Sequence, residues 1–180
     1  MTTWAVLASG PSMSQAIADS VKGRCKVAVV SDVYKIAPWA DALVSTDAAW
    51  WLHHKEALNF EGLKFGAMPE FRPVPGVERV MADTSTNSGL LAVMVAVQLG
   101  AKRVLLCGVD LHSPGDHFFG KHPAPLKSTT ADRMGVFKRQ FSAYRPKGVE
   151  IINCTPGSAL HTFPKGNLED CLAQSSVLAA

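Results

Sequence analysis

The chain lacks the cysteine spacing of a zinc or redox protein and the long apolar segment of a membrane protein. Its four cysteines, at positions 25, 107, 154 and 171, form no Cys-x-x-Cys pair, so they indicate neither a zinc knuckle nor a thioredoxin-like site. No segment reaches about 18 consecutive apolar residues, and no basic region followed by a long apolar run opens the chain. We therefore expect a reduced, cytoplasmic protein without a membrane span.

The chain also lacks a strong excess of charge. It has 18 Lys and Arg residues against 15 Asp and Glu, a net charge of +3, and its basic residues are scattered. This distribution does not predict nucleic-acid binding. With 180 residues, 47% of them hydrophobic, the chain can bury about 70% of its unfolded surface in one core. We expect one domain over residues 1–180.

The chain does contain a repeated pattern of short apolar segments, most of which end in polar residues or glycine. The predicted strands lie before Ser9 and at 26–32, 42–47, 63–68, 78–81, 103–110 and 149–154. Helical patterns follow at 13–22, 48–58, 89–99 and 130–144, and near 167. The 89–99 segment is apolar nearly all round and should be central, whereas His53 and His54 should lie on an exposed helix face. This alternation predicts an α/β fold with a mostly parallel, doubly wound sheet and helices on both faces.

In such sheets ligands bind outside the carboxyl ends of the strands. The pattern therefore gathers the polar residues that follow the strands at one edge of the sheet. The candidate nucleotide- and phosphate-binding residues are Ser9, Gly10, Pro11, Ser12, Asp32, Thr46, Asp47, Asn87, Ser88, Gly89, Gly108, Asn153 and Ser158.

The turn formed by Ser9, Gly10, Pro11 and Ser12 is a candidate phosphate cradle. Gly10 permits a tight turn, Pro11 suits a first helical position, and the two serine hydroxyls can cap the helix or donate to a phosphate oxygen. The same residues are also compatible with a plain turn and a capping serine. The segment 87–89, Asn-Ser-Gly, opens the central helix and supplies a second set of unpaired helix N–H groups.

Asp110 and Asp47 follow strands and could hold Mg²⁺ or a ribose, or could instead cap turns and helices. Residues 111–130 are loop-like, and a loop of this length is often functional, so we expect a lid or active-site loop. Within it, His112 or His117 is a candidate general base, and Asp110 a candidate catalytic group beside them. A weaker alternative is a metal site, and another is that the histidines are ordinary surface residues. The metal site would use Asp110, His112, Asp116, His117 and His122.

Four short motifs, taken together, resemble one superfamily. They are residues 7–12 (Leu-Ala-Ser-Gly-Pro-Ser), 86–89 (Thr-Asn-Ser-Gly), 99–110 (Leu-Gly-Ala-Lys-Arg-Val-Leu-Leu-Cys-Gly-Val-Asp), and Asn153 with 158–160 (Ser-Ala-Leu). They are similar to motifs of bacterial lipooligosaccharide sialyltransferases, which use a CMP-activated sugar. They are also similar to motifs of archaeal 6-hydroxymethyl-dihydropterin pyrophosphokinases and related proteins, some of them encoded by phages.

The resemblance implies a Rossmann-like nucleotide-binding domain in which the Gly-Pro-Ser turn and the Ser-Gly helix start contact the nucleotide, with a lid after the strand at 103–110. Two departures stand out. The sialyltransferases generally have an amide residue where this chain has Ser9, and a longer lid with tyrosines. Here the only tyrosines are Tyr34 and Tyr144.

Three functions remain open from the sequence. The favoured one is a transferase that takes a glycosyl group from a CMP-sugar or similar nucleotide-sugar ligand. The second is Mg²⁺-dependent phosphoryl or diphosphoryl transfer from ATP. The third is a non-catalytic ligand-binding or assembly module of a phage, alone or as an oligomer.

Overall fold

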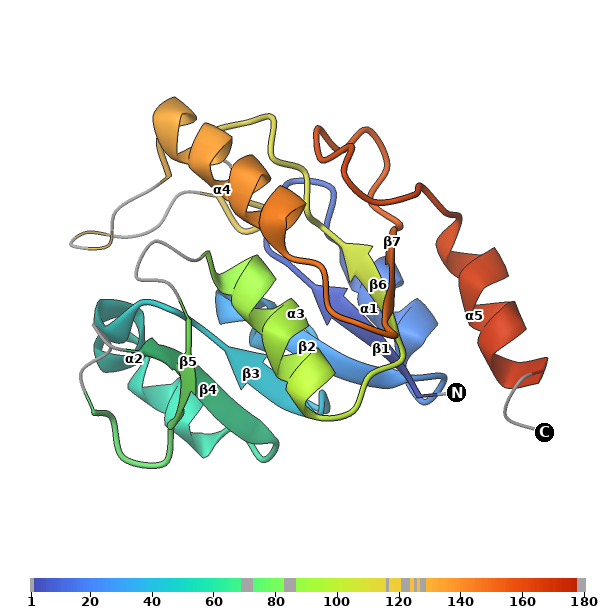
Figure 1. Cartoon of the computed structure of the whole chain (residues 1–180). Coiled ribbons are helices and arrows are strands. Elements are labelled where there is room, and N and C mark those ends of the chain that lie inside the picture. Colours follow the sequence, from blue (N-terminus) through green and yellow to red (C-terminus); the bar gives the residue numbers. More distant parts are fainter. Residues whose placement is uncertain are drawn as a thin grey trace.

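The computed structural model describes residues 2–68, 73–82, 87–115, 117–120, 124, 126 and 129–177. Its centre is one seven-stranded sheet in which every pairing is parallel (Figure 1). The strands are β1 (Thr3–Leu7), β2 (Lys26–Val30), β3 (Ala42–Val44), β4 (Leu63–Met68), β5 (Glu78–Met81), β6 (Arg103–Cys107) and β7 (Glu150–Asn153). The predicted α/β fold with a parallel sheet is confirmed, and all seven predicted strands are present.

The strand order is β5-β4-β3-β2-β1-β6-β7. The chain therefore builds outward from β1 to β5, crosses back over the sheet through α3 (Ser88–Gln98), and continues on the other side of β1 with β6 and β7. The order reverses between β1 and β6. In open parallel sheets, such a reversal opens a crevice at the carboxyl ends of the two strands, here beside Leu7 and Cys107.

Helices cover both faces of the sheet, as the alternating pattern predicts (Figure 1). Along β1, Trp4 and Val6 belong to the core on one face, while Ala5 and Leu7 belong to the core on the other. The first face packs against α3 and α4 (Ala131–Ala143), and the second against α1 (Gln15–Val21), α2 (Ala48–His53) and α5 (Leu168–Val177). Most of α3 is buried, so the prediction of a central helix is confirmed.

The first helix begins later than predicted. Its N-cap is Ser14, whose side chain accepts from the Ile17 amide, and α1 starts at Gln15. Pro11 lies in a separate turn closed by the Met13 amide, which donates to the Gly10 carbonyl at 3.0 Å. The expectation that Pro11 occupies a first helical position, with Ser9 or Ser12 as the cap, is therefore wrong.

The helix expected over 48–58 is two short helices, α2 and the 3₁₀ helix η2 (Lys55–Asn59), while η1 (Ser31–Lys35) follows β2 directly. His54 ends α2 with a non-helical backbone conformation (φ −100°, ψ +63°). It is only 7% exposed, and its ring lies 4.8 Å from that of Trp50. The prediction that His54 is exposed is wrong because it assumed one continuous helix. Among the described residues, no helix has the length and apolar character needed to cross a membrane.

Candidate functional site

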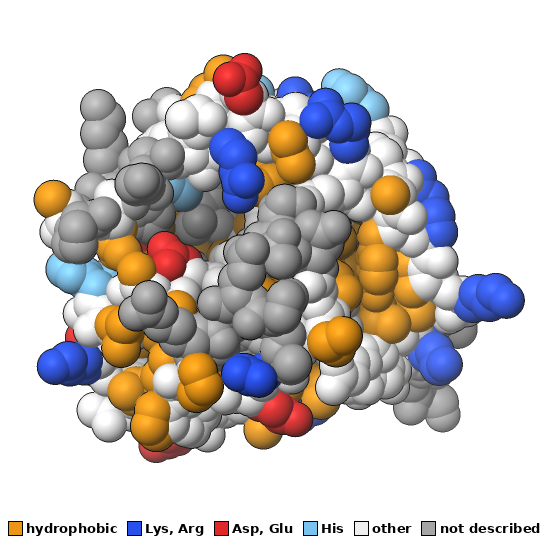
Figure 2. Space-filling view, turned by 60° about the vertical axis from the view of Figure 1, so that its left-hand side comes forward, with side chains coloured by type: hydrophobic (Ala, Val, Ile, Leu, Met, Phe, Trp, Pro, Cys, Tyr) orange, Lys and Arg blue, Asp and Glu red, His pale blue; other side chains and the backbone are white. Residues whose placement is uncertain are grey.

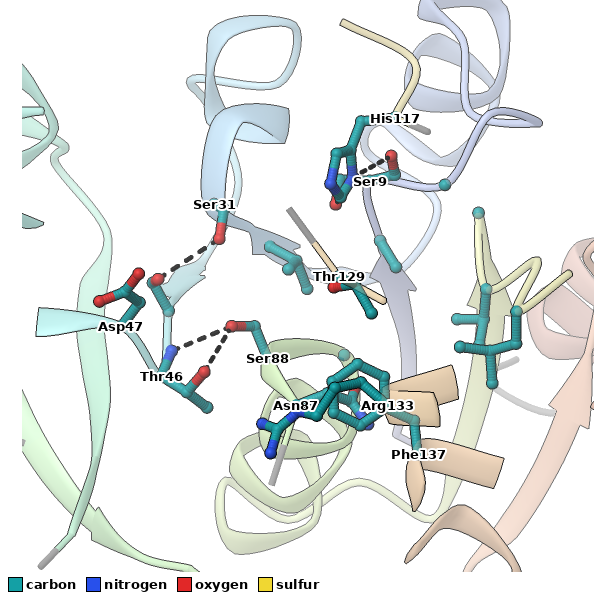
Figure 3. Close-up of a pocket in the computed structure, with 18 of the residues that line it drawn as sticks. Ser9, Ser31, Thr46, Asp47, Asn87, Ser88, His117, Thr129, Arg133 and Phe137 are labelled. Atoms are coloured by element: carbon teal, nitrogen blue, oxygen red, sulfur yellow. Dashed lines mark hydrogen bonds between the residues drawn. The ribbon is translucent and has the colours of Figure 1, made fainter. Parts of the chain in front are cut away.

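A cavity of about 690 Å³ lies at the carboxyl ends of the strands where the sheet order reverses. It brings together most of the candidate residues: Ser9, Gly10, Pro11, Thr46, Asp47, Asn87, Ser88, Gly89, Gly108, Asp110 and His117. Figure 3 labels six of them: Ser9 after β1, Thr46 and Asp47 after β3, Asn87 and Ser88 at the start of α3, and His117 in the loop after β6. The convergence follows from the topology, since the carboxyl ends of parallel strands meet at one edge.

Two glycines let the turn after β1 and the turn after β6 touch. The Gly10 amide donates to the Gly108 carbonyl at 2.9 Å. A Cβ on Gly10 would lie 2.0 Å from a carboxylate oxygen of Asp110, and a Cβ on Gly108 would lie 2.3 Å from the Ala8 carbonyl oxygen. Gly108 also has a φ of +72°, a conformation that glycine adopts without a steric penalty. The floor of the cavity therefore depends on these glycines.

Asp110 accepts hydrogen bonds from the turn after β1. It is 4% exposed, and its Oδ2 accepts from the Ser12 hydroxyl at 2.9 Å and from the Ser12 amide at 3.4 Å. Its Oδ1 lies 3.6 Å from Nε2 of His112. The amides of Gly10, Ser12 and Met13 all donate within the protein. The turn therefore presents its Ser9 side chain to the cavity, while Ser12 faces Asp110.

Among the histidines that the structure describes, His117 lines the cavity. Its Nδ1 lies 3.2 Å from both the hydroxyl and the backbone carbonyl of Ser9, and its ring stacks on Phe119 with centroids 5.0 Å apart. A carbonyl oxygen can only accept, so we assign a proton to Nδ1, while Nε2 is buried. The His112 side chain, in contrast, is 44% exposed and its Nδ1 pairs with Ser113 at 2.6 Å.

Hydroxyl groups join the start of α3 to the end of β3. Ser88 Oγ accepts from the Thr46 amide at 3.0 Å and lies 3.0 Å from the Thr46 hydroxyl (Figure 3). Asn87 caps the helix by accepting from the Leu90 amide at 2.9 Å. The α3 N-terminus, with its partial positive charge, is thereby held against the cavity.

The structure adds residues that the sequence interpretation missed. Ser31, the first residue of η1, and Ser45, directly after β3, line the cavity. Further lining residues come from α4 and the residues before it: Thr129, Thr130, Arg133, Met134, Phe137 and Phe141. The Arg133 guanidinium lies 5.3 Å from the centre of the Phe137 ring. A signal was present in the sequence, because positions 133, 137 and 141 are four residues apart and so share one face of a helix.

Five candidates lie outside the cavity lining: Ser12, Asp32, His112, Asn153 and Ser158. Asp32 is 3% exposed and accepts from Lys35 at 2.6 Å and from the Trp50 indole at 2.9 Å. Burial alone would raise the pKa of Asp32, but these hydrogen bonds and the nearby His54 outweigh it and lower that pKa.

Asn153 and Ser158 join the ends of β6 and β7. The Ser158 hydroxyl donates to the Val109 carbonyl at 2.6 Å, and the Asn153 amide group donates to Ser158 and to the Leu160 carbonyl, each at 3.0 Å. Both side chains are nearly fully buried. Their polar groups are therefore satisfied within the protein, behind the cavity.

The side chains that could ligate a metal ion give limited support to a metal site. Within the part of the chain that the structure describes, no three His, Cys, Asp or Glu side chains are grouped so as to hold a metal ion. Asp116 and His122, which the metal-site alternative requires, lie outside the described residues. Asp110 already accepts two hydrogen bonds from Ser12, so it fits a magnesium ligand poorly, while Asp47 caps α2 through the Ala49 amide.

The described face in Figure 2 shows Lys and Arg side chains lying apart from one another, without a continuous basic patch.

No family model, curated protein or solved structure matches the chain.

Proposed function

We propose that the cavity binds a nucleotide and that the protein transfers a glycosyl group from a nucleotide-activated sugar of the CMP-sugar class. The observation that carries this proposal is the position of the 690 Å³ cavity. It lies at the reversal of a parallel sheet, where nucleotides bind in doubly wound folds, and it combines hydroxyl groups, a histidine and an arginine.

Two features of the cavity suit a phosphate group. The N-terminus of α3 carries partial positive charge, which is worth about 0.3–1 kcal/mol for an exposed anion. Arg133 adds a guanidinium that can make two parallel hydrogen bonds to phosphate oxygens. Both line the same cavity, so a nucleotide phosphate can contact them together.

His117 is the candidate general base because it lines the cavity. Its Nε2 is buried in this structure, so this role requires Nε2 to become accessible when the ligand binds. Nε2 then takes a proton from the acceptor hydroxyl, and the acceptor oxygen forms a bond to the anomeric carbon of the sugar. The bond between that carbon and the phosphate oxygen breaks, and the nucleotide leaves with the electron pair. The Ser9 carbonyl holds the Nδ1 proton and stabilises the charged ring that results.

The Mg²⁺-dependent alternative has less support. Magnesium in nucleotide sites is usually bound by one or two carboxylates and the substrate phosphates. The two hydrogen bonds from Ser12 occupy one oxygen of Asp110, so Asp47 would have to supply the main carboxylate.

Calorimetric titration with CMP, CTP and ATP, with and without Mg²⁺, tests nucleotide binding. Tight binding of CMP without metal supports the glycosyl-transfer proposal, and binding of ATP that requires Mg²⁺ would favour phosphoryl transfer instead. Failure to bind any of the three would overturn both.

Release of CMP from CMP-N-acetylneuraminate, with water or an added oligosaccharide as acceptor, tests catalysis. We expect His117→Gln to lower kcat by about 10²–10⁴-fold while CMP binding is retained. His112→Gln, in the same loop but outside the cavity, is the matched control and should leave kcat unchanged. Binding without any CMP release would identify a non-catalytic module, and equal effects of the two variants would exclude His117 as the base.

A further inference from the structure

We infer that Asp47 selects ligands that carry a vicinal diol, by accepting hydrogen bonds from two adjacent hydroxyl groups. The diol can belong to the ribose of a nucleotide or to the glycosyl group attached to it. This inference rests on the proposed function, because it assumes that a nucleotide or nucleotide-sugar occupies the cavity.

The two carboxylates that follow β2 and β3 differ in their exposure. In doubly wound folds, an acidic residue near the end of the second strand often binds ribose hydroxyls. Here that residue, Asp32, is 3% exposed and accepts from Lys35 and Trp50. Asp47 is exposed and lines the cavity. The carboxylate available to a ligand is therefore the one after β3.

The Asp47 carboxylate is held in place by the helix that it caps. Its Oδ1 accepts from the Ala49 amide at 2.8 Å, which fixes the orientation of the group before a ligand arrives. Among the described residues, no Lys, Arg or His forms an ion pair with Asp47. A fixed carboxylate with spare acceptor capacity can accept from a pair of neighbouring hydroxyls, and such charge-assisted bonds are short and strong.

Acidic and basic side chains lie at separate positions around the cavity. Figure 3 shows Asp47 on one side, with Ser31 and Thr46, and His117 on the opposite side with Ser9. Arg133 approaches from α4. A sugar phosphate carries hydroxyl donors and an anionic group at separate positions, and the cavity offers an acceptor and a cation at separate positions to match.

Asp47→Asn is a suitable test variant because Asn and Asp are about equally good N-caps. It removes the negative charge and keeps the cap of α2, so the thermal midpoint should be unchanged. Asp170→Asn, an exposed acidic residue on α5, is the matched control.

The measurement is the Kd of each protein for CMP, ATP, their 2′-deoxy counterparts and CMP-N-acetylneuraminate, with and without Mg²⁺. If the diol is the ribose, Asp47→Asn should weaken binding of CMP or ATP by about tenfold or more and that of the 2′-deoxy forms much less. If the diol is on the sugar, only CMP-N-acetylneuraminate should bind more weakly. Asp170→Asn should change none of these values.

The remaining outcomes contradict the inference. Unchanged Kd values for Asp47→Asn, with nucleotides still bound, would overturn the role of Asp47 and leave the proposed function standing. An effect seen only with Mg²⁺ would make Asp47 a metal ligand instead. If the unaltered protein binds no nucleotide, the proposed function fails, and this inference fails with it.

Discussion

At the scale of single residues, the cavity depends on a close approach between two backbone segments. Gly108 has a φ of +72°, and a Cβ there would lie 2.3 Å from the Ala8 carbonyl oxygen. Backbone atoms at the centre of a sheet cannot move aside easily. The contact between β1 and β6 therefore requires glycine for its conformation and for its small size.

We predict that Gly108→Ala lowers the free energy of unfolding by about 3 kcal/mol or more, through the combined cost of a left-handed backbone conformation and overpacking. Urea denaturation measures this change. Gly148→Ala is the matched control, because Gly148 has a φ of +69° and a Cβ there would meet no atom within 4 Å. Its loss should be only about 1 kcal/mol, and equal losses in the two variants would show that close packing at Gly108 contributes nothing.

Residues at the strand ends were predictable, but the direction of each side chain was not. Asp32 and Asp47 both follow apolar runs, yet η1 begins immediately after β2 and turns Asp32 toward Trp50. Strand periodicity cannot predict that turn, because it is set by tertiary contacts with Lys35 and Trp50. Likewise, Asn153 and Ser158 are polar residues near a strand end that serve to connect neighbouring loops.

At the scale of elements, α4 contributes to the cavity without being deeply buried itself. Phe141 is the one residue of this helix that is buried; its ring lies 6.4 Å from that of Phe163 and close to Gly89 at the start of α3. This anchor holds the face that carries Arg133 and Phe137 toward the cavity. The helix itself was predicted correctly, but its place over the site was not, because a long loop separates it from β6.

We predict that Arg133→Ala weakens the binding of CMP by roughly tenfold or more, since hydrogen bonds to charged groups are worth about 1.5–3 kcal/mol. Calorimetry with CMP at two ionic strengths measures the loss and its salt dependence. Arg139→Ala removes an exposed arginine of the same helix that does not line the cavity, and it should bind CMP normally. If Arg139→Ala matches Arg133→Ala, the effect comes from the general charge of α4, and Arg133 makes no specific contact.

At the scale of the whole molecule, the two faces of the sheet differ in their chemistry. The face covered by α3 and α4 leads to the cavity, whereas the face covered by α1, α2 and α5 contains the buried thiols of Cys107, Cys154 and Cys171, with Cys25 packed against them. All four cysteines are free thiols. Burial raises the pKa of Cys25 to about 11, and burial with the neighbouring Cys171 raises that of Cys154 to about 12.

These raised pKa values predict a loss of stability in alkali. An unfolded thiol ionises near pH 8.5, whereas the folded protein keeps Cys25 and Cys154 protonated up to about pH 11 and 12. Below about pH 8 both states keep these thiols protonated, so the thiols do not affect the free energy of unfolding. Above about pH 8 the unfolded state binds fewer protons than the folded state. The free energy of unfolding therefore falls by about 1.4 kcal/mol per pH unit for each thiol. Urea denaturation from pH 7 to 10.5 under reducing conditions measures the slope, and the double variant Cys25→Ala/Cys154→Ala should lose stability less steeply than the unaltered protein. An unchanged slope would mean that the alkaline transition comes from other groups and that these two thiols ionise as readily in the folded core as in water.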